Sequence, residues 1–135
     1  MSFKLDRQLV ADTYLLHEAD DYLLLLHQKA WVPWFIIVPK SEHSEWYELS
    51  DALQDRINGL INRLSGFLKQ KLNADKLNIA TIGNVVSQLH IHVIGRYKDD
   101  YCWPSVVWGQ GVFKPYADDE LNRLRSLLKE QGMLL

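Results

Sequence analysis

The sequence predicts an α+β protein: an antiparallel sheet, one long helix and shorter helices towards both ends. Two continuous apolar runs, 22–26 and 34–38, have the length and composition of buried strands. Residues 50–72 carry apolar side chains at the helical spacing i, i+3, i+4 and i+7. Segments 77–82 and 86–97 have the pattern of two more strands, and the short turn between them favours antiparallel pairing.

The remaining elements follow from local signals. Residues 3–11 predict a short helix, 14–16 a strand and 118–131 a final helix with acidic residues at its start. Ser50 is a suitable N-cap for the long helix, and Asn73 a suitable C-terminal stop.

Two further features concern the surface of the protein. Residues 98–116 lack any periodic pattern, and a segment of this length is usually functional or mobile. Ala52, Gly59 and Gly66 recur every seven residues on the long helix. This stripe of small residues favours close packing against another element, although glycines tolerated on an exposed face would give the same pattern.

Length and composition predict a single domain spanning residues 1–135. The chain is 47% hydrophobic and 24% charged, as in ordinary soluble proteins. Its net charge of −2 gives no general attraction for nucleic acid or anionic lipid.

Cys102 is the only cysteine, so an internal disulfide is excluded and a cytoplasmic location is expected. No apolar run reaches the length of a membrane span, and the N-terminus lacks the apolar region of a signal peptide.

The most informative stretch is residues 88–96. In a strand, successive side chains point to opposite faces, so Gln88, His90 and His92 share one face while apolar residues occupy the other. Imidazole is the side chain best suited to proton transfer near neutral pH, and it also serves as a nucleophile or a metal ligand.

Plainer interpretations compete with a catalytic site. A polar row on a strand is often only a solvated sheet face. The His-x-His spacing also occurs in metal sites, but these need further ligands, and His17, His27 and His43 show no metal-binding spacing. We therefore predict no metal site and assign these three histidines to surface or packing roles. Trp103 and Trp108 could line a base pocket or pin their loop to the core.

Residues 88–94, with the sequence Gln-Leu-His-Ile-His-Val-Ile, resemble the signature of the histidine triad (HIT) superfamily, which reads His-φ-His-φ-His-φ-φ with φ apolar. The lead-in Gly83-Asn84, the following Gly95-Arg96 and the order of elements fit the same family. The variant with glutamine in the first position, together with the tryptophan-rich tail, resembles a bacterial subgroup of HIT-like proteins.

The resemblance implies a HIT-like antiparallel sheet with helices, usually in a homodimer. It also implies an enzyme that binds a nucleotide and cleaves at its α-phosphate. His90 matches the family's nucleophile, and His92 matches the histidine that hydrogen-bonds near the scissile phosphate and leaving-group oxygen. Gln88, Asn84 and Gly83 are then the expected phosphate-binding residues.

Several positions depart from the family pattern. Gln88 replaces the first histidine, and Trp34 replaces a fourth histidine that other members carry before the third strand. Val85 stands where several relatives have a hydroxyl. The ribose-binding Asp or Asn of relatives falls near residues 27–29, where Gln28 is the expected nucleotide-binding residue.

The predicted function is nucleotide hydrolysis or nucleotidyl transfer through a nucleotidyl-His90 intermediate. The substrate would be a nucleoside monophosphate derivative, such as a dinucleoside polyphosphate, a phosphoramidate or an acyl-nucleotide. No cofactor is required, although a divalent cation can accompany the substrate. We expect a homodimer with no nucleic acid or membrane partner. The alternative is a nucleotide-binding protein whose catalysis is vestigial.

Overall fold

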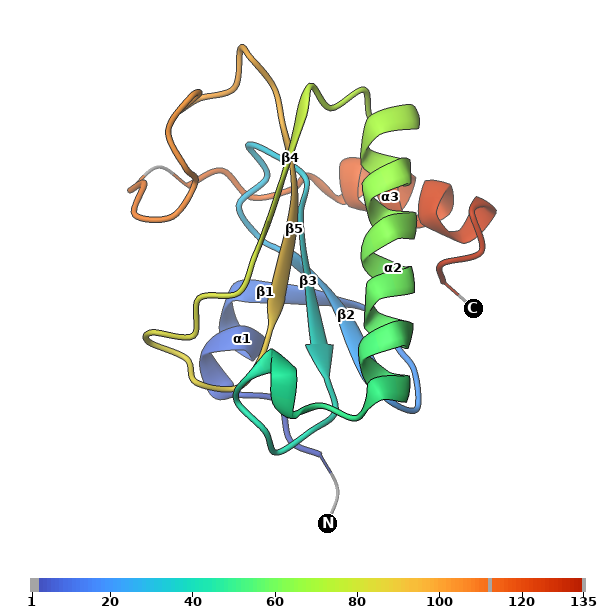
Figure 1. Ribbon diagram of the computed structural model, residues 1–135. Coiled ribbons are helices and arrows are strands. Elements are labelled where there is room, and N and C mark those ends of the chain that lie inside the picture. The colour runs from blue at the N-terminus through green and yellow to red at the C-terminus, as the bar shows by residue number, and fades with distance from the viewer. Residues whose placement is uncertain (1–2, 112, 135) are drawn as a thin grey trace.

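The computed structural model describes residues 3–111 and 113–134 and contains a five-stranded, fully antiparallel sheet (Figure 1). The strand order is β1-β2-β3-β5-β4. In chain order the strands are β1 (Thr13–Glu18), β2 (Tyr22–His27), β3 (Trp34–Pro39), β4 (Lys76–Ala80) and β5 (Ile91–Arg96). The α+β fold class predicted from the sequence is therefore confirmed.

The helices also follow the predicted order: α1 (Arg7–Asp12), α2 (Asp51–Gln70) and α3 (Asp118–Glu130), with a short 3₁₀ turn, η1 (Trp46–Glu48), before α2. Ser50 caps α2, because its hydroxyl oxygen accepts a hydrogen bond from the Leu53 N–H at 3.2 Å. Asn73 follows the end of α2 with a φ of 57°, the left-handed conformation that stops helices. None of the helices in the described part of the chain is long and apolar enough to cross a membrane.

Two predicted elements begin at least four residues later than expected. The N-terminal helix begins at Arg7 and not at residue 3, because Asp6 acts as its N-cap and accepts a hydrogen bond from the Gln8 N–H. The strand predicted over 86–97 begins only at Ile91. Pairing with both neighbours begins there, since Ile37 of β3 pairs with Ile91 and Ala80, the last residue of β4, pairs with His92. β3 continues to Pro39, but the residues before Ile91 do not pair with it.

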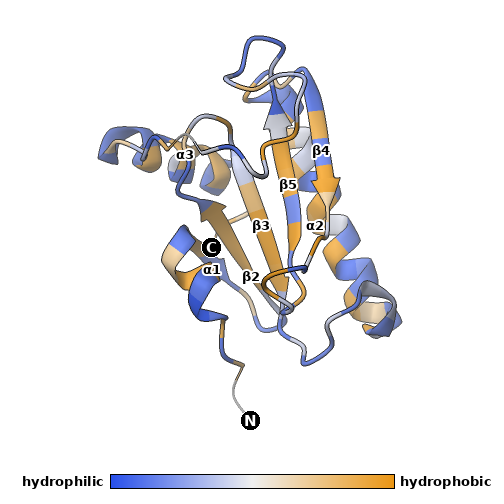
Figure 2. Cartoon of the chain, turned by 90° about the vertical axis from the view of Figure 1, so that its left-hand side faces the viewer, coloured by the Kyte–Doolittle hydropathy of each residue, from blue (hydrophilic) through white to orange (hydrophobic). Residues whose placement is uncertain are grey.

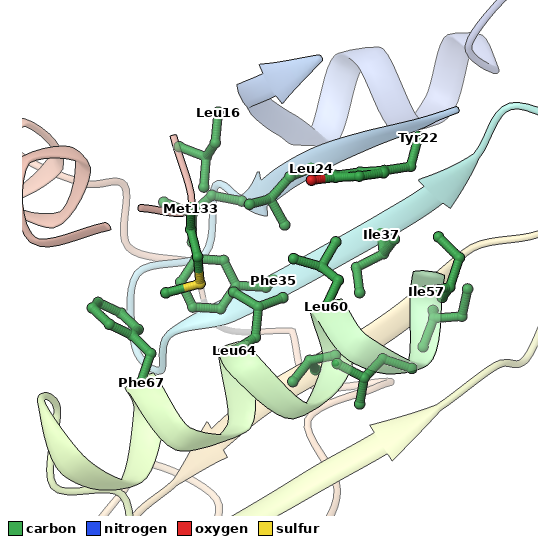
Figure 3. Packing of buried hydrophobic residues seen from close by; sticks show 14 of the residues in the cluster. Leu16, Tyr22, Leu24, Phe35, Ile37, Ile57, Leu60, Leu64, Phe67 and Met133 are labelled. Atoms are coloured by element: carbon green, nitrogen blue, oxygen red, sulfur yellow. The ribbon is translucent and has the colours of Figure 1, made fainter. Parts of the chain in front are cut away.

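One face of the sheet forms the main core with α2 and α3 (Figure 3). Phe35 and Ile37 of β3 and Val93 of β5 point to this face and pack with apolar side chains of α2 such as Leu64. The stripe of small residues on α2 does not take part in this packing. Ala52 and Gly59 are exposed, and nothing lies within 4 Å of a side chain placed at Gly59 or Gly66.

The other face of the sheet is covered by α1 and by residues of the irregular segment 98–116. Figure 2 views the sheet from this side, with α1 in front and α2 behind. Trp34 and Ile36 of β3, Ile94 of β5, Leu9 of α1 and Val107 form a second apolar cluster here. Strands β2 and β3 are thus buried on both faces, which explains their continuous apolar runs.

A buried arginine ties the irregular segment to the sheet. Arg96, at the end of β5, is only 1% exposed. Its guanidinium donates to both carboxylate oxygens of Asp100 at 2.8 and 3.1 Å, to Asn78 Oδ1 at 2.9 Å and to the Ser105 carbonyl at 2.7 Å. This bidentate ion pair and its neighbours hold the segment in a defined path, which brings Trp108 onto the sheet face.

Candidate functional site

A pocket of about 370 Å³ lies on the face of the sheet that carries α1. His90 and His92 line it together with residues from α1, the ends of β2 and β3, the 82–86 connection and the 107–109 segment. Most of the lining is apolar, and a few polar groups converge within it. This composition is typical of small-molecule sites.

His90 is held in a defined tautomer. The ring is 7% exposed, and its Nδ1 lies 2.7 Å from the backbone carbonyl of Gln88. A carbonyl can only accept, so Nδ1 must carry the proton. The other ring nitrogen, Nε2, then keeps its lone pair free, as a nucleophile requires.

His92 lies beside His90, with their ring centroids 5.0 Å apart. It is 5% exposed, and its Nδ1 lies 2.8 Å from the indole Nε1 of Trp34. The ring of Trp108 meets His92 edge-on at 5.1 Å. Burial lowers the pKa of His92 to about 3, and the nearby His90 and His27 add to this shift. His92 is therefore neutral at physiological pH.

A third histidine, His27, joins the pocket from the end of β2. It stacks on Trp34 at 4.2 Å, and its Nδ1 accepts the backbone N–H of Lys29 at 3.1 Å. Burial lowers the pKa of His27 to about 4; the positive charge of Lys29 also lowers it, and the carboxylate of Asp12 partly opposes the shift. The sequence analysis assigned His27 to a surface or packing role, and the structure places it in the pocket.

The polar groups at the rest of the pocket come from α1 and from the 82–86 connection. Asp12 is the only carboxylate among the described lining residues, and its Oδ2 accepts the Gln8 side-chain amide at 2.9 Å. Gly83 and Asn84 also line the pocket, and Gly83 adopts a φ of 67° that favours glycine.

Two of the predicted binding residues lie outside this pocket. Gln88 is turned towards the N-terminal segment, where its Oε1 accepts the Asp6 N–H at 2.8 Å and its Nε2 donates to the Lys4 carbonyl at 2.9 Å. Its amide therefore holds the segment that leads into α1. Gln28 does not line the pocket, and its Nε2 lies 3.5 Å from the carbonyl of Thr13.

A larger hollow of about 470 Å³ lies on the other side of Gln88, next to Lys4, Lys40 and His43. It contains neither His90 nor His92, so the smaller pocket is the better candidate for chemistry.

Trp103 and Trp108 take different roles. Trp108 lines the pocket, whereas Trp103 lies against the Arg96 guanidinium at 5.5 Å. Among the described residues, no cluster of three His, Cys, Asp or Glu side chains could hold a metal ion.

The pocket thus holds a buried histidine with a fixed tautomer, His90, beside a second buried histidine, His92. The HIT domain family model matches residues 8–99, and the chain therefore belongs to the histidine triad family. No curated protein matches the chain. Proteins of this family are in general nucleotide-binding hydrolases and transferases.

Solved structures of histidine triad proteins agree with this assignment over nearly the whole chain. The protein from Sinorhizobium meliloti 1021 is 32% identical, with a TM-score of 0.90 and coverage of 96% of this chain and 97% of that one. The protein from Bradyrhizobium japonicum is 32% identical, with a TM-score of 0.92 and coverage of 97% and 98%. The protein from Marinobacter aquaeolei VT8 is 35% identical, with a TM-score of 0.89 and coverage of 96% and 95%.

Proposed function

We propose that the protein cleaves or transfers a nucleotide at its α-phosphate through a covalent intermediate on His90. The observation that carries this proposal is the hydrogen bond from His90 Nδ1 to the Gln88 carbonyl at 2.7 Å. It leaves Nε2 as a neutral nucleophile, which approaches an anionic phosphate more easily than an anion would. The same hydrogen bond stabilises the positive charge that the ring acquires once Nε2 is bonded to phosphorus.

The other pocket residues fit the parts of a nucleotide. His92 donates a hydrogen bond to an oxygen at the scissile phosphate. Asn84 and the backbone at Gly83 provide neutral donors for the remaining phosphate oxygens. The apolar lining suits the base. Asp12, as a carboxylate, would repel a phosphate, and we assign it to the sugar hydroxyls in place of Gln28.

The reaction has two displacements. The Nε2 lone pair forms a bond to phosphorus, and the bond to the leaving-group oxygen breaks with its electron pair on that oxygen. Water then attacks phosphorus, the N–P bond breaks, and the pair returns to Nε2 while the water proton passes to solvent. An acceptor other than water gives transfer instead of hydrolysis. A divalent cation can bind the substrate's phosphates. We place the enzyme in the cytoplasm, consistent with its single cysteine.

The test is a substrate screen with dinucleoside polyphosphates, acyl-nucleotides and phosphoramidates, with nucleotide binding measured separately. Turnover of one of these classes is the expected result. Mass spectrometry of acid-quenched protein should show a nucleotidyl adduct on His90 in wild type and none in His90→Ala. Tight nucleotide binding without turnover would instead identify a binding protein that has lost catalysis.

A further inference from the structure

We propose that Trp34 fixes His92 as a permanently neutral hydrogen-bond donor, so that the site releases only leaving groups that depart without gaining a proton. The substrates are then phosphoric or acyl-phosphoric anhydrides, whose leaving groups are phosphates or carboxylates, and not phosphoramidates. This inference rests on the proposed function and narrows its substrate class.

The contact between Trp34 and His92 permits only one arrangement of protons. An indole N–H donates and cannot accept, so His92 Nδ1, 2.8 Å away, must be the acceptor. The neutral ring therefore carries its proton on Nε2. A proton on Nδ1 would set two N–H groups against each other. Both side chains are buried, at 3% and 5% exposure, and the stack of His27 on Trp34 at 4.2 Å holds the indole in place.

The charged and titratable groups around His92 do not supply a proton in its place. They are His90, His27, Asp12 and Lys29 among the described residues that line the pocket. His90 is the nucleophile. His27 repeats the arrangement of His92, because its Nδ1 accepts the Lys29 backbone N–H and burial lowers its pKa to about 4. The Asp12 carboxylate accepts a hydrogen bond from Gln8, and the Lys29 ammonium donates to the Gln110 carbonyl at 3.3 Å.

Two residues near the histidines have side chains that cannot titrate. Trp34 is one of them, and Gln88, whose amide is bonded to Lys4 and Asp6, is the other. The pocket can thus stabilise negative charge with the His92 Nε2–H without transferring that proton.

Because His92 donates a hydrogen bond without transferring its proton, the site favours some leaving groups over others. When the P–O bond of an anhydride breaks, the electron pair stays on a phosphate or carboxylate oxygen, which is stable as an anion. When the P–N bond of a phosphoramidate breaks, the pair falls on nitrogen, which must gain a proton as it leaves. The first reaction needs only the donor that His92 provides, and the second needs an acid, which the neutral His92 is not.

The tautomer is tested by ¹⁵N NMR of imidazole-labelled protein, without any substrate. His92 should show a bare Nδ1 and a protonated Nε2, unchanged between about pH 5 and pH 8. Trp34→Phe should release the ring, so that part of the neutral His92 rings carry the proton on Nδ1 instead of Nε2. Trp108→Phe is the matched control, because Trp108 contacts the same ring but makes no hydrogen bond to it, and it should leave the signals unchanged. A His92 that titrates in wild type, or that is unaffected by Trp34→Phe, would overturn the inference.

The substrate class is tested with nucleoside monophosphates that carry leaving groups of graded basicity. The wild-type kcat/KM should fall several-fold for each unit of leaving-group pKa, and a phosphoramidate should react at least about 100-fold more slowly than an anhydride of the same nucleoside. Equal rates for amine and phosphate leaving groups in wild type would refute the inference, and a selective loss of the amine reaction in Lys29→Met would identify Lys29 as the acid.

The two proposals fail in different ways. If no nucleotide derivative reacts, the proposed function falls and the leaving-group selectivity falls with it, while the NMR result still decides the state of His92. If phosphoramidates react through a His90 adduct as fast as anhydrides do, the function stands and the selectivity is wrong.

Discussion

Acidification should destabilise the protein well before its carboxylates are protonated, because two histidines are buried in their neutral forms. The pKa of His92 is lowered from 6.5 to about 3 and that of His27 from 6.5 to about 4, mainly by burial. Below about pH 6.5 the unfolded chain binds protons at both positions and the folded protein does not. The free energy of unfolding therefore falls as the pH is lowered, until each folded-state pKa is reached.

The size of the effect follows from the shifts. For each histidine that stays neutral in the folded protein, the free energy of unfolding falls by about 1.4 kcal/mol per pH unit below the ordinary pKa. Between about pH 6.5 and pH 5 this amounts to roughly 2 kcal/mol for His92, which is 5% exposed, and to a smaller loss for the half-buried His27. Such a loss is a large fraction of the stability of a typical domain.

Urea unfolding followed by tryptophan fluorescence at about pH 7.5, 6 and 5 measures this slope. His92→Asn keeps an acceptor for the Trp34 indole but cannot titrate, so its slope should be shallower by about 1.4 kcal/mol per pH unit. His43→Gln is the control for replacing a histidine with an amide, because His43 is exposed and lies outside the pocket. A wild-type stability that is flat over this range, or a slope that His92→Asn leaves intact, would show that burial does not hold these rings neutral.

The remaining predictions concern the nucleophile, the loop anchor, a tight strand position and the assembly. His90→Ala should abolish turnover but keep the nucleotide Kd within about tenfold, as judged by calorimetry, because the loss falls on the covalent step; an active variant would refute the mechanism. Arg96→Met should lower the free energy of unfolding by about 3–5 kcal/mol, since it leaves the buried Asp100 carboxylate without its partner, and unchanged urea curves would contradict this. Gly95→Ala should destabilise by about 1–3 kcal/mol, because its Cβ would lie 3.0 Å from Leu68 Cδ2, whereas Gly59→Ala on open surface is the control. Finally, we expect a homodimer, and sedimentation that gives a monomer at micromolar concentration would disprove it.

The elements of the fold could be predicted from the sequence because their signals are local. The period of apolar residues and the Ser50 cap specify α2, and the uninterrupted apolar runs specify the doubly buried strands β2 and β3. The start of β5 could not be predicted, since a strand begins only where it hydrogen-bonds to a neighbouring strand. Ile91 begins β5 only because β3 and β4 stop pairing there.

Some features of the site could likewise be predicted from the sequence, and others could not. His90 and His92 stand two residues apart in a pattern that is visible in the sequence, so the chain itself indicates the proposed nucleophile and its neighbour. The sequence marks Trp34 only as a departure from the family pattern and gives His27 no site role. Both reach His92 only because β3 lies between β2 and β5 in the sheet. The direction of the Gln88 side-chain amide could not be predicted either, since its hydrogen-bond partners Lys4 and Asp6 lie more than 80 residues away in the sequence. The sequence determined which groups can react, whereas the tertiary structure decided their proton states, because burial and long-range hydrogen bonds exist only in the folded chain.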